Sequence, residues 1–122
     1  MEITKELASY LARTTYDDLS NEARGMAKVC LLDWLGAAII GSTSEAGKLV
    51  ADFVKERGGK QEATLIGYGD KTSCINAALA NGVVGHALEV DDYYKVKTLA
   101  GHLGGVTIAP ALALAELERA TG

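Results

Sequence analysis

The chain has 122 residues, the length of one domain, and a chain of this size can bury a core of its own. Its 12 basic and 16 acidic residues give a net charge of −4, which argues against a nucleic-acid partner because no basic face is available to neutralise phosphates. The longest apolar run, Val29–Ile40, is broken by Asp33 and is shorter than the ~20 residues of a membrane span. We therefore predict a single helical domain over residues 1–122, with no membrane partner.

The cysteines and the N-terminal segment indicate a cytoplasmic location. Cys30 and Cys74 lie far apart in apolar contexts and form no CxxC pair. Free cysteines are among the most buried residues, and disulfides are rare in a reducing compartment, so we expect two buried thiols. The first residues, MEITKELASYLA, are polar and acidic, unlike a signal or transit peptide.

Helical periodicity accounts for the first half of the chain. Apolar residues at 3–4 spacing predict a helix over Ile3–Ala12. Ser20 suits the start of a second helix, Asn21–Ile40, whose later part is apolar on nearly every side and so requires neighbours on every side. Asp33 in that part is expected to cap or pair internally. A third helix is predicted over Ser44–Arg57.

The second half of the chain reads as one short strand and two further helices. Ala63–Tyr68 is the only strand-like segment, so we expect at most one short strand or hairpin near residues 63–68. An Ala-rich helix from Cys74 to about Leu88 precedes a charged turn, Glu89–Gly101. A last helix runs from about Gly105 to Ala120. The predicted fold class is all-α, a multi-helix bundle.

The apolar content indicates that the chain is covered by another surface. Hydrophobic residues make up 48% of the sequence, and several predicted helices are apolar on more than one face. Exposed apolar surface of this kind usually marks an interface. We therefore expect a homodimer or a higher oligomer.

Candidate acid–base groups gather in the acidic turn after the fourth helix. His86, Glu89 and Tyr93 are spaced i, i+3 and i+7, which places them on one face if the helix continues through them. Asp91 and Asp92 lie opposite them or in the turn. Neighbouring carboxylates disfavour each other's ionisation, which prepares such a group for general acid–base catalysis. The alternative is a solvated acidic turn without a function.

His102 strengthens the case for a site. Gly104-Gly105 follow it at the start of an apolar helix, and a glycine-rich helix N-terminus is a natural binding place for a carboxylate or phosphate. A histidine beside such a place fits proton transfer at a carbon next to a carboxylate. In the alternative interpretation His102 is a loop histidine with no role, and His86 is a satisfied core histidine.

A metal site is the third interpretation. The turn and its surroundings contain donors that suit a divalent ion: His86, Glu89, Asp91, Asp92 and His102. Their spacing matches no compact ligand motif such as H-E-x-x-H. We therefore predict no metal; the metal content of the purified protein would test this.

Three motifs together resemble the N-terminal helical part of the MmgE/PrpD family. They are DWLGAAIIGS (Asp33–Ser42), ATLIGYGDKTSCINAALANGVVGHALEVDD (Ala63–Asp92) and the Gly-rich stretch with His102 that leads to IAPALALAE (Ile108–Glu116). That family includes 2-methylcitrate dehydratase, cis-aconitate decarboxylase and iminodisuccinate epimerase. The resemblance covers essentially the whole chain but only the first portion of the family's longer proteins.

The resemblance implies a mostly helical dimer with cofactor-independent chemistry on small polycarboxylic acids. Glu89 stands where the family pattern H-[AS]-x-D-[FY]-D-D has its first Asp. Asp91 and Asp92 match the DD pair, Tyr93 replaces a Thr or similar residue, and His102 matches the His of the later motif. By the resemblance these are the expected catalytic residues. Those expected to bind substrate are His86, Gly104 and Gly105.

The sequence also departs from the family pattern. The common His-Pro is His102-Leu103 here, and the segment Tyr94–Gly101 is longer than usual. The resemblance places the family's catalytic lysines, second histidine and α/β lid domain beyond residue 122. We therefore expect a lyase or isomerase that abstracts a proton next to a carboxylate and is incomplete as this chain alone; a separate partner chain or the rest of a longer protein would supply the remainder. The alternative is a non-catalytic helical module for dimerisation or for binding a small acid.

Overall fold

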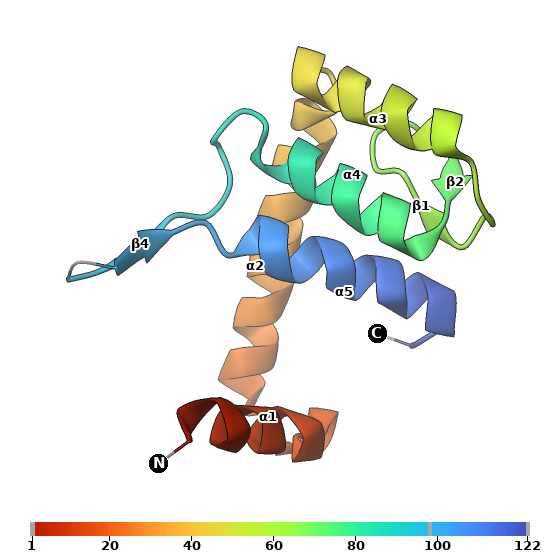
Figure 1. Ribbon diagram of the computed structural model, residues 1–122. Coiled ribbons are helices and arrows are strands. Elements are labelled where there is room, and N and C mark those ends of the chain that lie inside the picture. The colour runs from red at the N-terminus through yellow and green to blue at the C-terminus, as the bar shows by residue number, and fades with distance from the viewer. Residues whose placement is uncertain (1, 98, 122) are drawn as a thin grey trace.

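The computed structural model describes residues 2–97 and 99–121 and confirms the all-α class (Figure 1). In these residues the helices are α1 (Ile3–Arg13), α2 (Asn21–Gly41), α3 (Glu45–Arg57), α4 (Cys74–His86) and α5 (Gly104–Glu118), with a 3₁₀ turn at Tyr16–Asp18. Two antiparallel pairs complete the fold: β1 (Ala63–Thr64) with β2 (Lys71–Thr72), and β3 (Tyr94–Val96) with β4 (Leu99–Gly101).

Serine caps explain why three helices begin where they do. The hydroxyl of Ser20 accepts from the N–H of Ala23 at 3.1 Å, which satisfies one of the free donors in the first turn of α2. Ser44 and Ser73 do the same for α3 and α4. These local signals lie in the sequence itself, and each predicted helix starts within about two residues of its observed start.

The core lies where α4 packs between α2 and α5. Trp34 of α2 is fully buried and forms a cluster with Ala38, Val84 and Ala109. Small residues allow the helices to approach closely: a Cβ on Gly41 would collide with the carbonyl of Val84. Figure 1 shows α4 and α5 side by side, with α3 along the other side of α4.

Strand β1 is shorter than the predicted strand, and the β1–β2 hairpin is hydrogen-bonded to α4. Residues 65–70 form a turn in which Gly67 and Gly69 take positive φ values of 86° and 76°, so the chain reverses before a longer strand can form. The buried Asn81 side chain holds this turn, since its Nδ2 donates to the Thr64 carbonyl at 2.9 Å and its Oδ1 accepts from the Ile66 N–H at 3.0 Å.

The chain forms a second hairpin, β3–β4, whereas the sequence predicted at most one short strand or hairpin. Tyr94–Val96 pairs with Leu99–Gly101 inside the segment predicted as a charged turn, and the pair projects away from the helices (Figure 1). Aromatic and β-branched residues favour strands, but the lysines between them obscure the alternation. The hairpin brings the ends of the segment together, which returns the chain to the start of α5.

The structure departs from three further statements made from the sequence. α4 ends at His86, so the condition for one helical face shared with Glu89 and Tyr93 is not met. Cys30 is exposed, contrary to the expected buried thiol, whereas Cys74 is partly buried. Asp33 is exposed and makes no hydrogen bond or ion pair with the described residues, contrary to the expected internal cap or pair. Cys30 and Asp33 both lie on α2, which leaves several large apolar side chains exposed.

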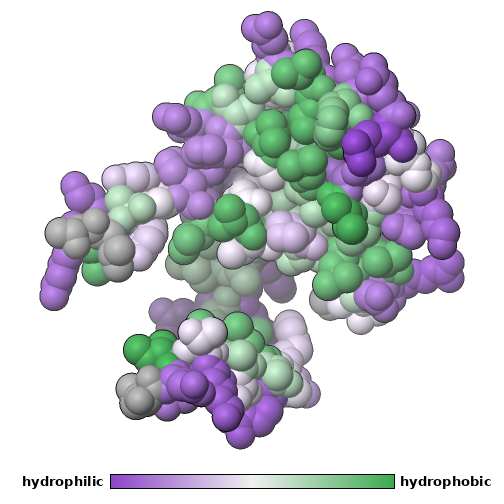
Figure 2. Space-filling view, viewed as in Figure 1, coloured by the Kyte–Doolittle hydropathy of each residue, from purple (hydrophilic) through white to green (hydrophobic). Residues whose placement is uncertain are grey.

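Much apolar surface is left open. Figure 2 shows hydrophobic surface over the bundle and on the N-terminal helices. In α1 and α2 the exposed large apolar side chains are Ile3, Leu7, Tyr10, Leu11, Met26, Val29, Leu32, Ile39 and Ile40. No single helix among the described residues has the length and hydropathy to cross a membrane; α2 and α3 pass that test only as a pair, bent by 87°.

Candidate functional site

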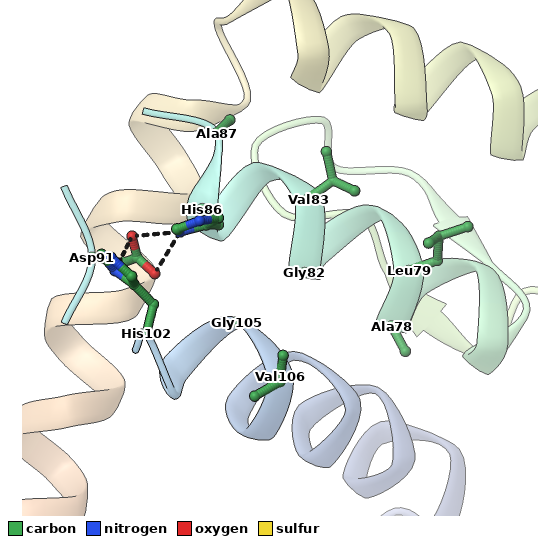
Figure 3. Close-up of a pocket in the computed structure, with 10 residues that line it drawn as sticks. All are labelled: Ala78, Leu79, Gly82, Val83, His86, Ala87, Asp91, His102, Gly105 and Val106. Carbon is green, nitrogen blue, oxygen red and sulfur yellow. Dashed lines mark hydrogen bonds and ion pairs between the residues drawn. The ribbon is translucent and has the colours of Figure 1, made fainter. Parts of the chain in front are cut away.

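Both histidines of the chain meet one buried carboxylate where α4 ends and α5 begins (Figure 3). His86 Nδ1 lies 3.0 Å from Oδ1 and 3.2 Å from Oδ2 of Asp91. His102 Nδ1 lies 3.2 Å from the same Oδ1, on the other side. The Asp91 side chain is 0% exposed, whereas 47% of His86 and 26% of His102 remain accessible. The carboxylate is thus buried beneath two accessible imidazoles, and we call these residues the His–Asp–His cluster.

The two contacts to Asp91 differ in quality. His86 makes a hydrogen bond to the carboxylate, whose donor depends on the tautomer of the ring. His102 Nδ1 lies 3.2 Å from Oδ1 of Asp91 but makes no hydrogen bond with the part of the chain that the structure describes, although the atom is buried. The two rings lie with centroids 4.6 Å apart and tilted by 58°. The buried carboxylate therefore holds His86 by a hydrogen bond and lies within ion-pair distance of His102.

The cluster stands at the end of a groove between α4 and α5 with a volume of about 660 Å³. Apart from the cluster, the groove is lined by small and apolar residues: Ala78, Leu79, Gly82, Val83, Ala87, Gly105 and Val106. None of these described lining residues is a lysine or an arginine. The groove thus offers imidazole and carboxylate groups at one end of an apolar channel.

Asp92 caps α5 instead of facing the groove. Its Oδ1 accepts from the Gly104 N–H at 2.8 Å and its Oδ2 accepts from the Leu103 N–H at 3.1 Å. A carboxylate at this position satisfies free donors and complements the helix dipole. Gly104 was predicted to help bind the carboxylate of a ligand. Its N–H instead donates to the Asp92 side chain of the same chain. Gly105 lines the groove.

The Trp34 ring packs against the end of α4 and the start of α5, the two elements that carry the site. A Cβ on Gly85 would collide with the indole ring of Trp34, and one on Gly104 would lie 2.9 Å from its Cδ1. Both glycines flank the cluster, one next to His86 and the other two residues after His102. The ring of a fully buried residue thus fixes the distance between the end of α4 and the start of α5.

The other predicted site residues lie at the edge of the cluster or outside it. Tyr93 is exposed, with its ring centroid 5.4 Å from that of His102. Glu89 is exposed, its φ of 51° is left-handed, and its N–H donates to the His86 carbonyl. The structure therefore brings together His86, Asp91 and His102, with Tyr93 adjacent, but not Glu89.

The sequence analysis did not connect Trp34 or the apolar groove lining with the site. Trp34 is a core residue, and nothing near it in the sequence indicates that two glycines from α4 and α5 pack against its ring. The lining was detectable in part, because Leu79, Gly82, Val83 and His86 share one face of an α4 helix by their 3–4 spacing.

Comparison with known proteins places the chain in a family. Residues 5–122 match the model of the MmgE/PrpD N-terminal domain. The cis-aconitate decarboxylase-like protein oryM of Aspergillus oryzae is 28% identical over 120 residues, covering 95% of this chain and 24% of the relative. Human cis-aconitate decarboxylase is 28% identical over 115 residues, covering 93% and 23%. For cis-aconitate decarboxylase of Aspergillus terreus the figures are 24% identity, 94% and 23%.

The chain thus spans about a quarter of the length of these relatives. No solved structure matches it. The helical architecture, the three motifs and the match over almost all residues agree, and the chain belongs to the MmgE/PrpD family.

Proposed function

We propose that this chain forms part of a lyase or isomerase that acts on a small polycarboxylic acid by abstracting a proton next to a carboxylate. The observation that carries the proposal is the His–Asp–His cluster at the end of an open groove. The names of its relatives, which include cis-aconitate decarboxylases, support a lyase that acts on a small polycarboxylic acid. The proposed function needs no cofactor, since an imidazole can accept the proton.

In this proposal His102 is the proton-transfer group. Its Nδ1 faces Asp91, which leaves Nε2 for the substrate C–H. Asp91 is a positioning residue: a buried carboxylate beside Nδ1 stabilises the imidazolium that forms when Nε2 takes the proton. His86 shares the same carboxylate and binds the substrate from the opposite wall of the groove.

The remaining predicted residues take smaller parts. Tyr93 lies next to His102, and in this proposal it contacts the substrate. Asp92 acts through the cap of α5, which holds Gly104 and Gly105 in place below the groove. Glu89, at the family's Asp position, is exposed and is not among the residues that line the groove, so it takes no part in the proposed proton transfer.

The charge of the groove supports a second contributor to the site. A polycarboxylate brings several negative charges, whereas the described lining holds Asp91, two histidines and otherwise small or apolar residues. Binding several carboxylates normally takes lysine or arginine side chains. We propose that these come from a separate chain or from sequence corresponding to the remaining three quarters of the relatives, and that the chain forms a homodimer or a higher oligomer through its exposed apolar faces.

An NMR titration tests the proposed function. The purified chain is titrated with cis-aconitate, citrate, 2-methylcitrate and iminodisuccinate while protein shifts and ligand conversion are followed in one sample. We expect shifts of the His86, Tyr93 and His102 resonances with at least one acid. Conversion would mean that the chain is catalytic alone; shifts without conversion would mean that it contributes a part of the site.

Variants separate the site from the fold. His102→Ala should abolish acid-dependent shifts and any turnover while leaving the helical circular dichroism unchanged. The matched control, Asp33→Asn, removes an exposed carboxylate of α2 that lies outside the cluster and the groove lining, so it should retain binding. If His102→Ala responds to the acids as the parent does, the assignment of His102 fails.

A non-catalytic helical module is the second candidate. The observation in its favour is the number of exposed large apolar side chains on α1 and α2, which a dimerisation module would bury. Stable self-association with no response to any of the four acids would favour this function over the first.

A further inference from the structure

We propose that Trp34 is a positioning residue of the site: the width of its indole ring sets how far apart the two histidines that share Asp91 are held. The inference rests on the proposed function, because it names a residue that acts on the proton transfer through the histidines. Trp34 is fully buried in α2 and is not among the residues that line the groove, so it acts without touching the substrate.

Two edges of the indole ring face the two elements that carry the histidines. A Cβ on Gly85, the residue before His86, would collide with Nε1 and would lie 2.7 Å from Cε2 of the ring. A Cβ on Gly104, two residues after His102, would lie 2.9 Å from Cδ1 and 3.4 Å from Cγ. Both backbones therefore approach the ring more closely than a side chain at either position would allow.

The start of α5 is also held by a second contact. The Asp92 carboxylate accepts from the Gly104 N–H at 2.8 Å. His102 thus precedes a helix start that is fixed by Trp34 and Asp92, whereas its own Nδ1 makes no hydrogen bond within the described residues. The position of this imidazole is therefore set through the backbone and not by a hydrogen bond from Nδ1.

The indole N–H indicates that Trp34 does more than fill the core. Its Nε1 is buried and has no hydrogen-bond partner among the described residues. Buried polar atoms in native proteins are nearly always paired, and an unpaired one costs stability. An apolar side chain would fill the space without that cost, so we attribute the use of tryptophan here to the size of its bicyclic ring.

Proton transfer is sensitive to the spacing that the ring sets. The rings of His86 and His102 have centroids 4.6 Å apart, and their Nδ1 atoms lie 3.0 Å and 3.2 Å from the same oxygen of Asp91. Catalytic groups have to be held within about 0.5 Å of the productive geometry, and a misplacement of about 1 Å can cost on the order of 100-fold in rate. A smaller ring would let α4 and α5 move relative to each other and would displace the two histidines with them.

Trp34→Phe tests the inference on the full chain, because it keeps an aromatic core residue but narrows the ring. We expect the imidazole nitrogen resonances of both histidines to shift in the folded variant, even without an acid. Acid binding in the NMR titration should weaken by about tenfold or more, and any turnover should lose more in kcat than in KM. The matched control is Val54→Ala, which opens the core in a separate cluster with Leu65 and Ala80 and should change neither readout.

A pair of variants supplies a test that core filling alone would not meet. Gly85→Ala places a methyl group against the indole edge and should displace the His86 resonances. Trp34→Phe removes Nε1 and part of that edge, so the double variant should bring the His86 resonances back toward those of the parent. Additive effects of the two changes would overturn the shared contact on which the inference depends.

The inference fails if folded Trp34→Phe behaves like Val54→Ala, with unchanged imidazole resonances and the acid response of the parent. If the parent itself responds to no acid, the proposed function fails instead, and the imidazole shifts measured without acid still decide whether Trp34 places the rings. Circular dichroism checks that each variant is folded.

A measurement on the unmutated chain covers the case in which the variants do not fold. The chain has one tryptophan, so its indole resonances are assigned without a variant. Nuclear Overhauser effects should connect the indole ring with the Hα atoms of both Gly85 and Gly104. Their absence at either glycine would overturn the inference.

Discussion

The N-terminal arm and the helical bundle are built from similar helices but are held in different ways. The arm comprises α1 and the first half of α2, residues 3–30, and in α1 no residue is buried. The bundle comprises the second half of α2 with α3, α4 and α5, and all four buried residues of α2, from Trp34 on, belong to it. Figure 1 shows α1 at the far end of α2 from the other helices.

The difference shows what local interactions contribute to a helix and what they do not. In the arm, the Thr15 N–H and hydroxyl bind the Asp18 carboxylate at 2.8 Å and 2.7 Å, and the Arg24 guanidinium lies over the Tyr16 ring. Such contacts define where helices begin, but most helical stability comes from burying an apolar face. The bundle has that burial within the chain, whereas the arm can obtain it only from another surface.

The largest expected effect is on the bundle. Trp34→Ala should lower the free energy of unfolding by about 3–5 kcal/mol, because it removes a fully buried indole and leaves a cavity under Gly85 and Gly104. Urea denaturation followed by circular dichroism measures this. A loss below about 1 kcal/mol would mean that the ring is not the centre of the core.

Asn81→Leu should cost about 2–3 kcal/mol. It leaves the Thr64 carbonyl and the Ile66 N–H without their partner in a part-buried turn. The matched control is Asn76→Ala: its Nδ2 donates to the Gly58 carbonyl at an exposed position, so its loss should cost less than about 1 kcal/mol. If both variants lose the same free energy of unfolding, the greater cost of breaking a buried hydrogen bond is contradicted.

Glu116→Gln should cost about 1 kcal/mol at neutral pH, after allowance for solvent screening. Burial raises the pKa of Glu116, but the hydrogen bonds from Thr64 and Lys71 outweigh it, and the net shift is downward. A lowered pKa in the folded state gives stability above the unfolded-state pKa that is lost as pH falls through the folded-state pKa.

The stability difference between parent and Glu116→Gln should therefore shrink as the pH is lowered from neutral to well below about 4. Urea titrations of both proteins along that range measure it. A difference that stays constant with pH would mean that the charge of Glu116 plays no part.

The smallest effect is expected in the arm. Leu7→Ala changes an exposed side chain of α1, so its free energy of unfolding should change by no more than about 0.5 kcal/mol in dilute solution. If the arm packs on a second copy, the cost should grow with protein concentration. Unfolding at two concentrations, with sedimentation of the same samples, separates these cases. A large cost that does not change with concentration would place α1 in the core of its own chain.

Much of the fold was predictable because its signals are local. Ser20, Ser44 and Ser73 mark helix starts through bonds within four residues, and the apolar periodicity marks the helix lengths. The β3–β4 hairpin was not predictable in this way, since exposed Lys95 and Lys97 conceal its strands.

The candidate site was predictable only as a set of residue types. The sequence placed His86, Asp91, Asp92 and His102 in one segment, and family motifs supported that choice. It did not separate the two aspartates, one of which is buried between imidazoles and the other bound to the start of α5. Neighbouring side chains in a loop point in directions that depend on backbone conformation, and no periodicity specifies this.

The sequence by itself determined the helical class, the helix starts and the family, because these depend on composition, capping and motif order along one dimension. The tertiary structure decided which acidic group is buried, because that depends on where the hairpin returns the chain and on how closely Gly85 and Gly104 approach Trp34. It also decided which apolar faces are covered. Burial depends on packing between segments that are distant in sequence. The apolar face of α1 is predicted by local periodicity, yet none of its residues is buried, so local sequence does not specify which faces are covered.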